Sequence, residues 1–346
     1  MSEIRVMLEE TVTRLFGEQV TTERIATAEK GVWLGELWDT LEQTGLTRPH
    51  LAEDVGGAGG TWLEAFVIAR AAGRHCVPLP VVETMLAGWL LAQAGVPVPD
   101  GPSSVAPTPL AGDALASDTI TAELEAVPWG RHVRHVVVTA ERGGRTVIAA
   151  VPVQGARVSH GCNVALEPRD TLGLTNHRTA GSGEASVPAA IVEQYGAMLR
   201  AAQMAGALEA ILEMAVRYAT ERVQFGRPIA KFQAIQHELA RLAGWVAEAG
   251  CAAEVACRAA AEGGDPSVEI AAAKVVVGEA AEHGPRIAHQ VHGAIGFTYE
   301  HALHFATRRL WAWRAEFGTP ERWADRLGER TLAAGADALW PWVTSR

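Results

Sequence analysis

Apolar residues recur at helical spacing along the first part of the chain. The earliest repeat has one apolar side chain every three or four positions: Ile4, Met7, Leu8, Val12 and Leu15. This spacing predicts an amphipathic helix. The glycine-rich segment 56–60 then separates two helical stretches. It lacks the Lys-Ser/Thr pair of a phosphate loop, so we interpret it as a turn.

The pattern changes between Pro97 and Ala189. Proline and glycine punctuate short β-branched runs there, of which 133–139 and 146–153 are the clearest, and such runs predict strands. From about Ala190 the helical pattern returns. The sequence therefore predicts a mostly α protein with a small β domain. We expect an N-terminal helical domain over residues 1–97, a shortened β domain over 98–189 and a C-terminal four-helix bundle over 190–346.

The helices of the bundle can be placed from the same pattern. Leu208, Ile211, Leu212, Ala215 and Ala219 line one face of a helix that the Gly226-Arg227-Pro228 segment ends. Further helices are predicted over 232–262, over 267–289 and after Gly296. Long helices joined by short turns are typical of an up-and-down bundle.

Composition narrows the function classes. The net charge of -10 and pI of about 5.7 argue against binding to nucleic acid or to an anionic membrane. The longest apolar run, near 89–98, is too short to span a bilayer, and the N-terminus shows no secretory signal. The four cysteines are scattered and form no Cys-x-x-Cys pair, which favours a reducing cytoplasm. His289-x-x-His292 and His301-x-x-His304 have ligand-like spacing but no completing ligand, so we expect surface or interface histidines and no metal.

Two segments carry candidate chemistry. Residues 222–233 cluster cations, amides and aromatic rings at helix termini, where backbone donors are unsatisfied and a pyrophosphate could bind. An ordinary interhelical turn explains the same composition. Residues 290–300 contain two glycines three positions apart, which allow close approach of a ligand or a backbone. That segment lacks the strand context of a dinucleotide-binding fingerprint.

Together these segments resemble the acyl-CoA dehydrogenase family. The first reads Arg-x-Gln-Phe-Gly-x-Pro-Ile-x-x-Phe-Gln and the second reads Gln-x-His-Gly-x-x-Gly-Phe-Thr. The resemblance implies an FAD that lies across a dimer interface. Its diphosphate and adenosine end would be held by Arg222, Gln224, Phe225, Ile229, Phe232 and Gln233, with help from Gln290 and Gly293. Thr319 matches a family threonine that contacts flavin near the substrate.

The chain departs from the family pattern at two places. The stretches that cradle the flavin ring in the family β domain are not readable around Val127-Pro128-Trp129. The family also abstracts the α-proton of an acyl-CoA thioester with a Glu. Phe317 occupies that position, and Glu316, one residue early, would point about 100° away on a helix. The alternative base position of the family falls near Gly196, where Glu193 is the nearest acid. Glu316 is the best candidate base in this chain.

Three hypotheses follow. In the first, the chain is one subunit of a heteromeric FAD-dependent acyl-CoA dehydrogenase, assembled as a heterotetramer with a full-length sister that carries the base. Short members of this type resemble enzymes that act on bulky thioesters from steroid and lipid degradation. In the second, the chain is a self-sufficient homo-oligomeric dehydrogenase with Glu316 as base. In the third, it is a flavin-free structural subunit.

Overall fold

The structure is a computed structural model that describes residues 3–116 and 118–344. The N-terminal region is helical, as predicted. Its helices are α1 (Glu3–Gln19), α2 (Thr22–Ala28), α3 (Gly35–Gln43), the 3-10 helix η1 (Glu53–Val55), α4 (Trp62–Arg74) and α5 (Val81–Gln93). Thr61 begins α4 with a capping box in which Glu64 reaches back to the Thr61 amide at 2.7 Å. The segment at 56–60 is a turn, in which Gly56 has a φ of 80°.

Two small sheets form the β domain. The first has the order β1-β3-β4-β7 and the second β2-β6-β5. The strands are β1 (Ser103–Val105), β2 (Thr119–Pro128), β3 (His135–Arg142), β4 (Arg145–Pro152), β5 (Arg157–Ser159), β6 (Arg169–Arg178) and β7 (Gly181–Ala185). The two predicted strands correspond to β3 and β4. The register of β2 against β6 shifts between Leu124 and Val127, so a bulge interrupts this strand pair before it continues to Pro128.

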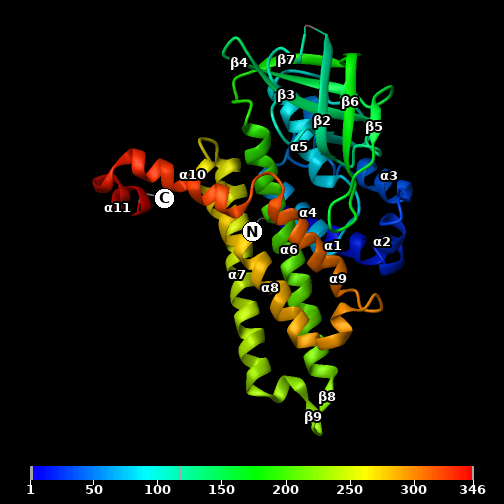
Figure 1. Ribbon diagram of the computed structural model, residues 1–346, viewed down its shortest axis with the longest axis vertical. Coiled ribbons are helices and arrows are strands. Elements are labelled where there is room, and N and C mark those ends of the chain that lie inside the picture. The colour runs from blue at the N-terminus through cyan, green and yellow to red at the C-terminus, as the bar shows by residue number, and fades with distance from the viewer. Residues whose placement is uncertain (1–2, 117, 345–346) are drawn as a thin grey trace.

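The C-terminal region is a helical bundle, which confirms the predicted fold class. It contains α6 (Ile191–Glu221), the hairpin β8 (Val223–Gln224) and β9 (Arg227–Pro228), the 3-10 helix η2 (Ile229–Lys231), α7 (Gln233–Glu262), α8 (Ser267–His292), the 3-10 helix η3 (Gly293–Phe297) and α9 (Leu303–Ala315). Helices α10 (Pro320–Ala334) and α11 (Ala336–Thr344) extend sideways from the body as an arm (Figure 1). The domain limits at 97 and 189 stay predictions.

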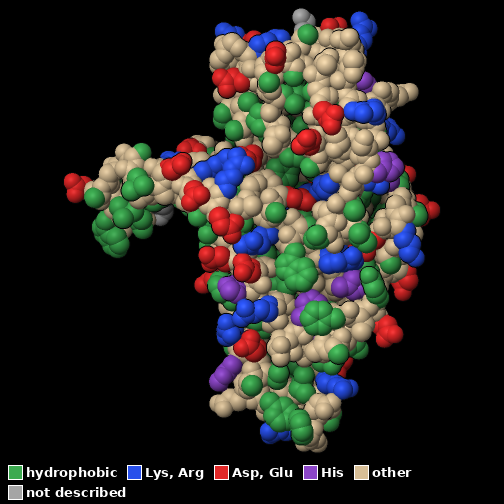
Figure 2. All heavy atoms as spheres, viewed as in Figure 1, with side chains coloured by type: hydrophobic (Ala, Val, Ile, Leu, Met, Phe, Trp, Pro, Cys, Tyr) green, Lys and Arg blue, Asp and Glu red, His purple; other side chains and the backbone are tan. Residues whose placement is uncertain are grey.

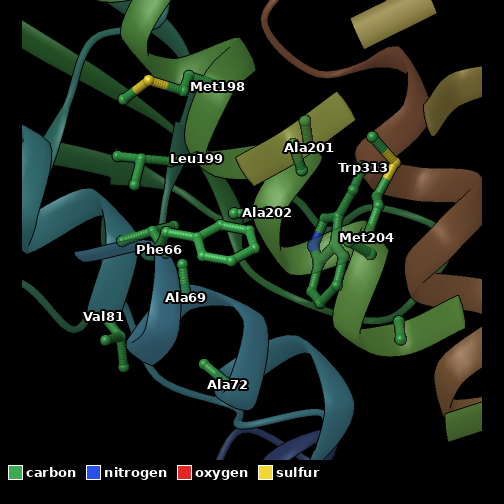
Figure 3. Packing of buried hydrophobic residues seen from close by; sticks show 14 of the residues in the cluster. Phe66, Ala69, Ala72, Val81, Met198, Leu199, Ala201, Ala202, Met204 and Trp313 are labelled. Atoms are coloured by element: carbon green, nitrogen blue, oxygen red, sulfur yellow. The ribbon is translucent and has the colours of Figure 1, made fainter. Parts of the chain in front are cut away.

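Helix α6 is the centre of the molecule. It contacts α4, α5, α7, α8 and α9, and nearly all its side chains from Ile191 to Leu208 are buried. A helix that is buried all round needs small residues where neighbours approach closely. A Cβ on Gly206 would lie 1.8 Å from the Arg70 carbonyl oxygen of α4. Figure 3 shows Phe66 and Ala69 of α4 on one side of α6 and Trp313 of α9 beside Met204. The same core thus joins the N-terminal helices to the bundle.

The described helices include none that is both long and apolar enough to cross a bilayer. All four cysteines are free thiols. Large apolar side chains remain exposed on the arm, including Leu332 and Trp340, which are 83% and 73% exposed.

Candidate functional site

The turn that follows α9 has a left-handed backbone. Phe317 has a φ of 53° and Gly318 a φ of 93°. A bulky residue in this region costs about 1–3 kcal/mol, so its surroundings must hold it there. Lys274 of α8 donates from Nζ to three carbonyl oxygens at the end of α9, at 2.8 to 3.0 Å. The indole of Trp323 donates to the Phe317 carbonyl oxygen at 2.9 Å.

Lys274 is fully buried. Burial lowers its pKa to about 7, while the three carbonyl acceptors favour the ammonium form. The side chain closes the C-terminus of α9, whose last carbonyl oxygens have no partner within the helix. Lys274 therefore fixes where the turn, and Phe317 with it, lies.

The Phe317 ring packs on Gly196 of α6. A Cβ on Gly196 would lie 2.3 Å from the Phe317 Cδ1 atom, so only glycine fits beneath this ring. Positions 317 and 196 are the two places where the family resemblance puts a catalytic acid. The structure brings them face to face, and neither carries a carboxyl group. Phe317 is 8% exposed and shields this contact from water.

Glu316, the candidate base from the sequence, points into a cluster of cations. Its carboxylate accepts hydrogen bonds from Arg169 Nε at 2.7 Å, from Arg200 Nε at 2.8 Å and from Asn163 Nδ2 at 3.1 Å. Burial raises the pKa of this carboxyl, but the two guanidinium groups outweigh burial and lower it to about 2. A carboxylate with so low a pKa and with its oxygens occupied is a poor general base. These contacts give Glu316 a structural role, and its role as the base stays a prediction.

Glu193, the nearest acid to the alternative base position, is held in the same way. Its two oxygens form ion pairs with Arg322 at 2.7 Å and Arg326 at 2.6 Å, both on α10. A Cβ on Gly318 would lie 3.4 Å from Glu193 Oε1, so this acid lies close to the turn but faces the arginines. Neither neighbouring acid is therefore free to take a proton.

Glu316 belongs to a chain of buried charges that joins all three regions. Successive members are 2.5 to 3.3 Å apart: Glu83, Arg200, Glu316, Arg169, Glu167, Arg309, Glu29 and Arg308. Four acids and four arginines alternate, so the chain is neutral as a whole. The indole of Trp313 adds a hydrogen bond to Glu167 at 2.9 Å. Burying charge is costly unless it is paired and hydrogen-bonded. Every charge in this chain of residues is paired, although Glu83 Oε2 and the Nε and Nη2 atoms of Arg309 form no hydrogen bond with the described residues.

Sequence reasoning missed this network. Isolated charged residues within apolar helical segments could have indicated the network. Glu83 is such a residue in α5, and Arg200 is one in the buried half of α6. Charged residues are almost never fully buried unless they are paired, so each such residue predicts a partner. The partner's identity depends on tertiary contacts and cannot be read from spacing.

The residues predicted to bind the ADP part of FAD gather at the far end of the bundle. Residues 222–228 form the end of α6 and the β8–β9 hairpin, and Gln233 begins α7. Tyr218, one turn before Arg222, stacks on His292 with ring centroids 4.7 Å apart. That contact brings Gln290 and Gly293, at the end of α8, to the same end of the bundle as the hairpin.

This bundle end is exposed and rich in free polar groups. Phe225 is 92% exposed, and Figure 2 shows hydrophobic side chains gathered at the lower end of the molecule. The side chains of Arg222, Gln224, Gln233 and Gln290 have no hydrogen-bond or ion-pair partner among the described residues. Phe232 packs edge-on against Phe225 and beneath Arg227, whose guanidinium carbon lies 4.4 Å from the ring centroid. Ile229 is half-buried beside them.

Thr319 lies elsewhere. Its hydroxyl accepts the Arg322 amide hydrogen at 3.4 Å and caps α10, next to the Phe317 turn. The β domain and the β8–β9 hairpin lie at opposite ends of the longest axis of the molecule (Figure 1). A single chain therefore does not bring the bundle end and its own β domain together around one ligand.

Of the four histidines with ligand-like spacing, His289, His292, His301 and His304, two do not lie at the surface. His289 and His292 are buried. The His289 ring stacks on Phe297 with ring centroids 4.4 Å apart, and the ring centroids of His292 and His301 are 4.6 Å apart. Burial lowers the pKa of each of these three histidines. In the described part of the chain, no three His, Cys, Asp or Glu side chains are grouped as a metal site.

Comparison with known proteins decides the family. The family model for the N-terminal domain of acyl-CoA dehydrogenases matches residues 2–97, and that for the C-terminal domain matches residues 194–332. The acyl-CoA dehydrogenase IpdE2 of Mycobacterium tuberculosis is 32% identical over 312 residues, which cover 89% of this chain and 91% of that protein. The chain belongs to the acyl-CoA dehydrogenase family. IpdE2 of Mycolicibacterium smegmatis is 29% identical over 94% of this chain and 98% of its own length.

Solved structures share the fold. One chain of the ChsE4–ChsE5 complex from Mycobacterium tuberculosis has a TM-score of 0.87 at 23% identity, covering 97% of this chain and 99% of its own. Butyryl-CoA dehydrogenase from Megasphaera elsdenii has a TM-score of 0.85 at 20% identity, covering 96% of this chain and 99% of its own. The expectation that the chain is a member of this enzyme family is confirmed, and so is the predicted order of helices, β domain and bundle.

Proposed function

We propose that this chain is one subunit of a hetero-oligomeric FAD-dependent acyl-CoA dehydrogenase, and that a full-length sister subunit carries the catalytic base. The observation that carries the proposal is the Phe317 ring packed on Gly196. Both positions at which family members place the base are filled without an acid. The two neighbouring acids, Glu316 and Glu193, are each held by two arginines. Proton abstraction from the acyl-CoA thioester then needs a carboxylate from another chain.

The bundle end fits the ADP part of FAD. A diphosphate needs cationic and hydrogen-bonding groups that are not already paired, and Arg222 and Gln224 provide them beside the unsatisfied end of α6. Phe225 and Phe232 offer apolar faces for an adenosine, with Ile229, Gln233, Gln290 and Gly293 around them. FAD, when bound, supplies the acceptor for the hydride removed from the substrate. The residues of this chain hold and orient its ADP end.

The β domain of this chain does not fit the flavin ring. Pro128 has no amide hydrogen to donate, and Ala126 and Val127 carry no polar side-chain group. Asn163 donates to Glu167 and Glu316 and accepts the amide hydrogens of residues 165 and 167, so its amide is fully used. The ring site is accordingly assigned to the sister subunit, with one competent site per pair of subunits.

The relatives support an assembly and a substrate class. One structural neighbour is described as a ChsE4–ChsE5 complex and another as a steroid acyl-CoA dehydrogenase, Tcur3481–Tcur3483. We propose that this chain likewise forms a heterotetramer, acts on a bulky steroid-derived acyl-CoA and resides in the cytoplasm, where its four thiols stay reduced. The exposed apolar side chains of the α10–α11 arm need a covering surface, which an assembly supplies.

The deciding experiment compares the purified chain with the chain co-expressed with its sister. We expect the chain alone to be colourless and the complex to be yellow, with flavin absorbance in proportion to subunit pairs. A chain that is yellow and active alone would instead support a homo-oligomeric dehydrogenase. A colourless complex would support a flavin-free structural subunit.

The Arg222→Ala variant of the complex tests the proposed ADP contact. Loss of one charge-assisted hydrogen bond costs about 1.5–3 kcal/mol, so FAD should be retained about ten- to a hundredfold less tightly. Arg258→Ala is the matched control, because Arg258 lies on α7 and forms only an exposed pair with Glu254. Equal flavin occupancy in the two variants would count against the assignment.

A further inference from the structure

A cavity of about 270 Å³ lies where the N-terminal helices meet the bundle. Its wall is formed by the junction of α1 and α2, the end of α4, the second half of α6 and the beginning of α9. The described residues that line it lie outside both the Phe317 turn and the segments predicted to bind FAD. The cavity is therefore separate from the site discussed above.

The floor of this cavity is apolar. Ile25 of α2 and Phe305 of α9 are 7% and 4% exposed, and Ala210, Ala302 and Ala306 contribute only methyl groups. The short alanine side chains leave the space between α6 and α9 open. The volume lies just below the range of drug-sized sites, roughly 300–1,000 Å³, so it suits an apolar body of one or two rings. A coenzyme A thioester or a four-ring steroid is too large for it.

The rim of the cavity carries one positive charge in excess. Arg74 Nη2 pairs with Glu213 Oε1 at 2.6 Å. Arg217, one turn further along α6, also lines the cavity but has no hydrogen-bond or ion-pair partner among the described residues. A guanidinium group binds a carboxylate through two parallel hydrogen bonds, so the unpaired Arg217 favours a ligand with one carboxylate.

His75, at the end of α4, adds a polar group to the wall. Its Nε2 atom is buried and has no hydrogen-bond partner within the part of the chain that the structure describes. Burial and the neighbouring Arg74 charge lower the pKa of His75, so the ring is neutral at pH 7. A buried polar atom without a partner costs free energy, which a polar group of a ligand can recover.

We infer that this cavity binds a small monocarboxylate with an apolar body of one or two rings. The carboxylate pairs with Arg217, and the body packs on Ile25 and Phe305. Residues of this chain alone form the site, so the inference depends neither on the sister subunit nor on the assignment of the FAD site. Because the ligand contacts four helices from two regions, its binding stabilises their junction.

Titration of the full-length chain with 2-naphthoate, followed by calorimetry, tests the ligand class. The matched probe is 2-naphthamide, which has the same rings and no charge. We expect saturable binding of 2-naphthoate and about tenfold or weaker binding of the amide, because the amide loses the charge-assisted contact. 2-Naphthoate should also raise the melting temperature of the chain. Equal affinities would overturn the carboxylate contact, and the absence of saturable binding would overturn the site.

Two arginine variants locate the carboxylate. Arg217→Gln should bind 2-naphthoate about tenfold more weakly and the amide unchanged. Arg286→Gln is the matched control, because Arg286 is likewise exposed on a bundle helix, has no ion pair within the described chain and lies outside the cavity. An equal effect of the two substitutions on 2-naphthoate binding would show that Arg217 is not the contact.

Two alanine variants locate the rings. Ala210→Leu fills the cavity from α6 and should weaken binding of both probes by about tenfold or more, whereas Ala260→Leu, at a half-buried position of α7 outside the cavity, should leave it unchanged. Thermal unfolding checks that both variants fold. If Ala210→Leu does not, Ala302→Leu fills the same cavity from the beginning of α9. Unchanged affinity in a folded cavity-filling variant would refute the site.

Discussion

Glu316→Gln separates a structural carboxylate from a catalytic one. The substitution keeps the size of the side chain and removes its charge. In the structure that charge lies between Arg169 and Arg200, whose side chains are 8% and 2% exposed. Removing it leaves two buried guanidinium groups with one anionic partner fewer. We expect the variant to lose stability and to keep most of its contribution to turnover.

The size of the effect follows from the pKa of Glu316. A fall from the ordinary value of 4.5 to about 2 means that the folded state favours the ionised form. At about 1.4 kcal/mol per pKa unit, this preference amounts to about 3 kcal/mol at neutral pH. Breaking a buried pair by removing one partner typically costs about 3–5 kcal/mol. The Glu316 side chain is 17% exposed and glutamine keeps one acceptor, so we expect the lower end of that range.

Two measurements on the assembled complex test this expectation. Urea unfolding gives the change in stability, and turnover per bound flavin gives the catalytic effect. Glu282→Gln is the control, because Glu282 pairs with Arg314 while 61% exposed and should cost under about 1 kcal/mol. Loss of a true general base lowers the rate by about 10²–10⁴. If Glu316→Gln lowers the turnover rate by that factor while stability and flavin content are unchanged, Glu316 is the base and the structural role is refuted.

Three further predictions concern the same region. First, because the folded-state pKa of Glu316 is lowered, its contribution to the free energy of unfolding is complete above about pH 4.5 and is lost as the pH falls toward 2. Urea unfolding at several pH values should therefore show a smaller loss of stability in acid for Glu316→Gln than for the wild type. Second, Gly196→Ala should lower the free energy of unfolding by about 1–3 kcal/mol, because the new Cβ meets the Phe317 ring. In a Phe317→Ala background the same substitution should be neutral or stabilising. Additive effects of the two substitutions in this double-mutant cycle would contradict the contact. Third, Lys274→Met leaves three carbonyl oxygens without their donor and should cost more than about 2 kcal/mol by thermal unfolding, so a neutral result would show that the turn is held by other contacts.

Much of the fold was predictable because local patterns and tertiary packing agree. The apolar stripe of α6, the turn signal at 226–228 and the helices predicted over 232–262 and 267–289 lie close to the observed limits of α6, α7 and α8. Strands β3 and β4 are β-branched and buried, so their runs stand out. Strands β2 and β6 were missed because both carry many exposed polar residues, and the β2 register shifts near Val127. Alternation is weak where a bulge interrupts it.

The candidate site was likewise predictable only in part from the sequence. The segments predicted to bind flavin are each contiguous in sequence, and one end of the bundle brings them together; their role in binding flavin stays a prediction. The role of Glu316 was not predictable, because its partners Arg169 and Arg200 lie far away in sequence. Glu316 was also expected to point away from position 317 as on a continuous helix. In fact α9 ends at Ala315, and residue 317 has a left-handed backbone. Direction across such a turn cannot be read from helical spacing.

The turn after α9 is held in a defined geometry, although neither position 317 nor position 196 carries an acid. Lys274 and Trp323 fix the turn, and the ion pairs of Glu316 tie that turn to α6 and to the β domain. These contacts determine where side chain 317 lies, whatever its chemistry. A protein that needed only the fold would not require a bulky residue at positive φ over a glycine that no other residue can replace. We propose that the turn therefore shapes a site, to which Phe317 contributes apolar contact and exclusion of water.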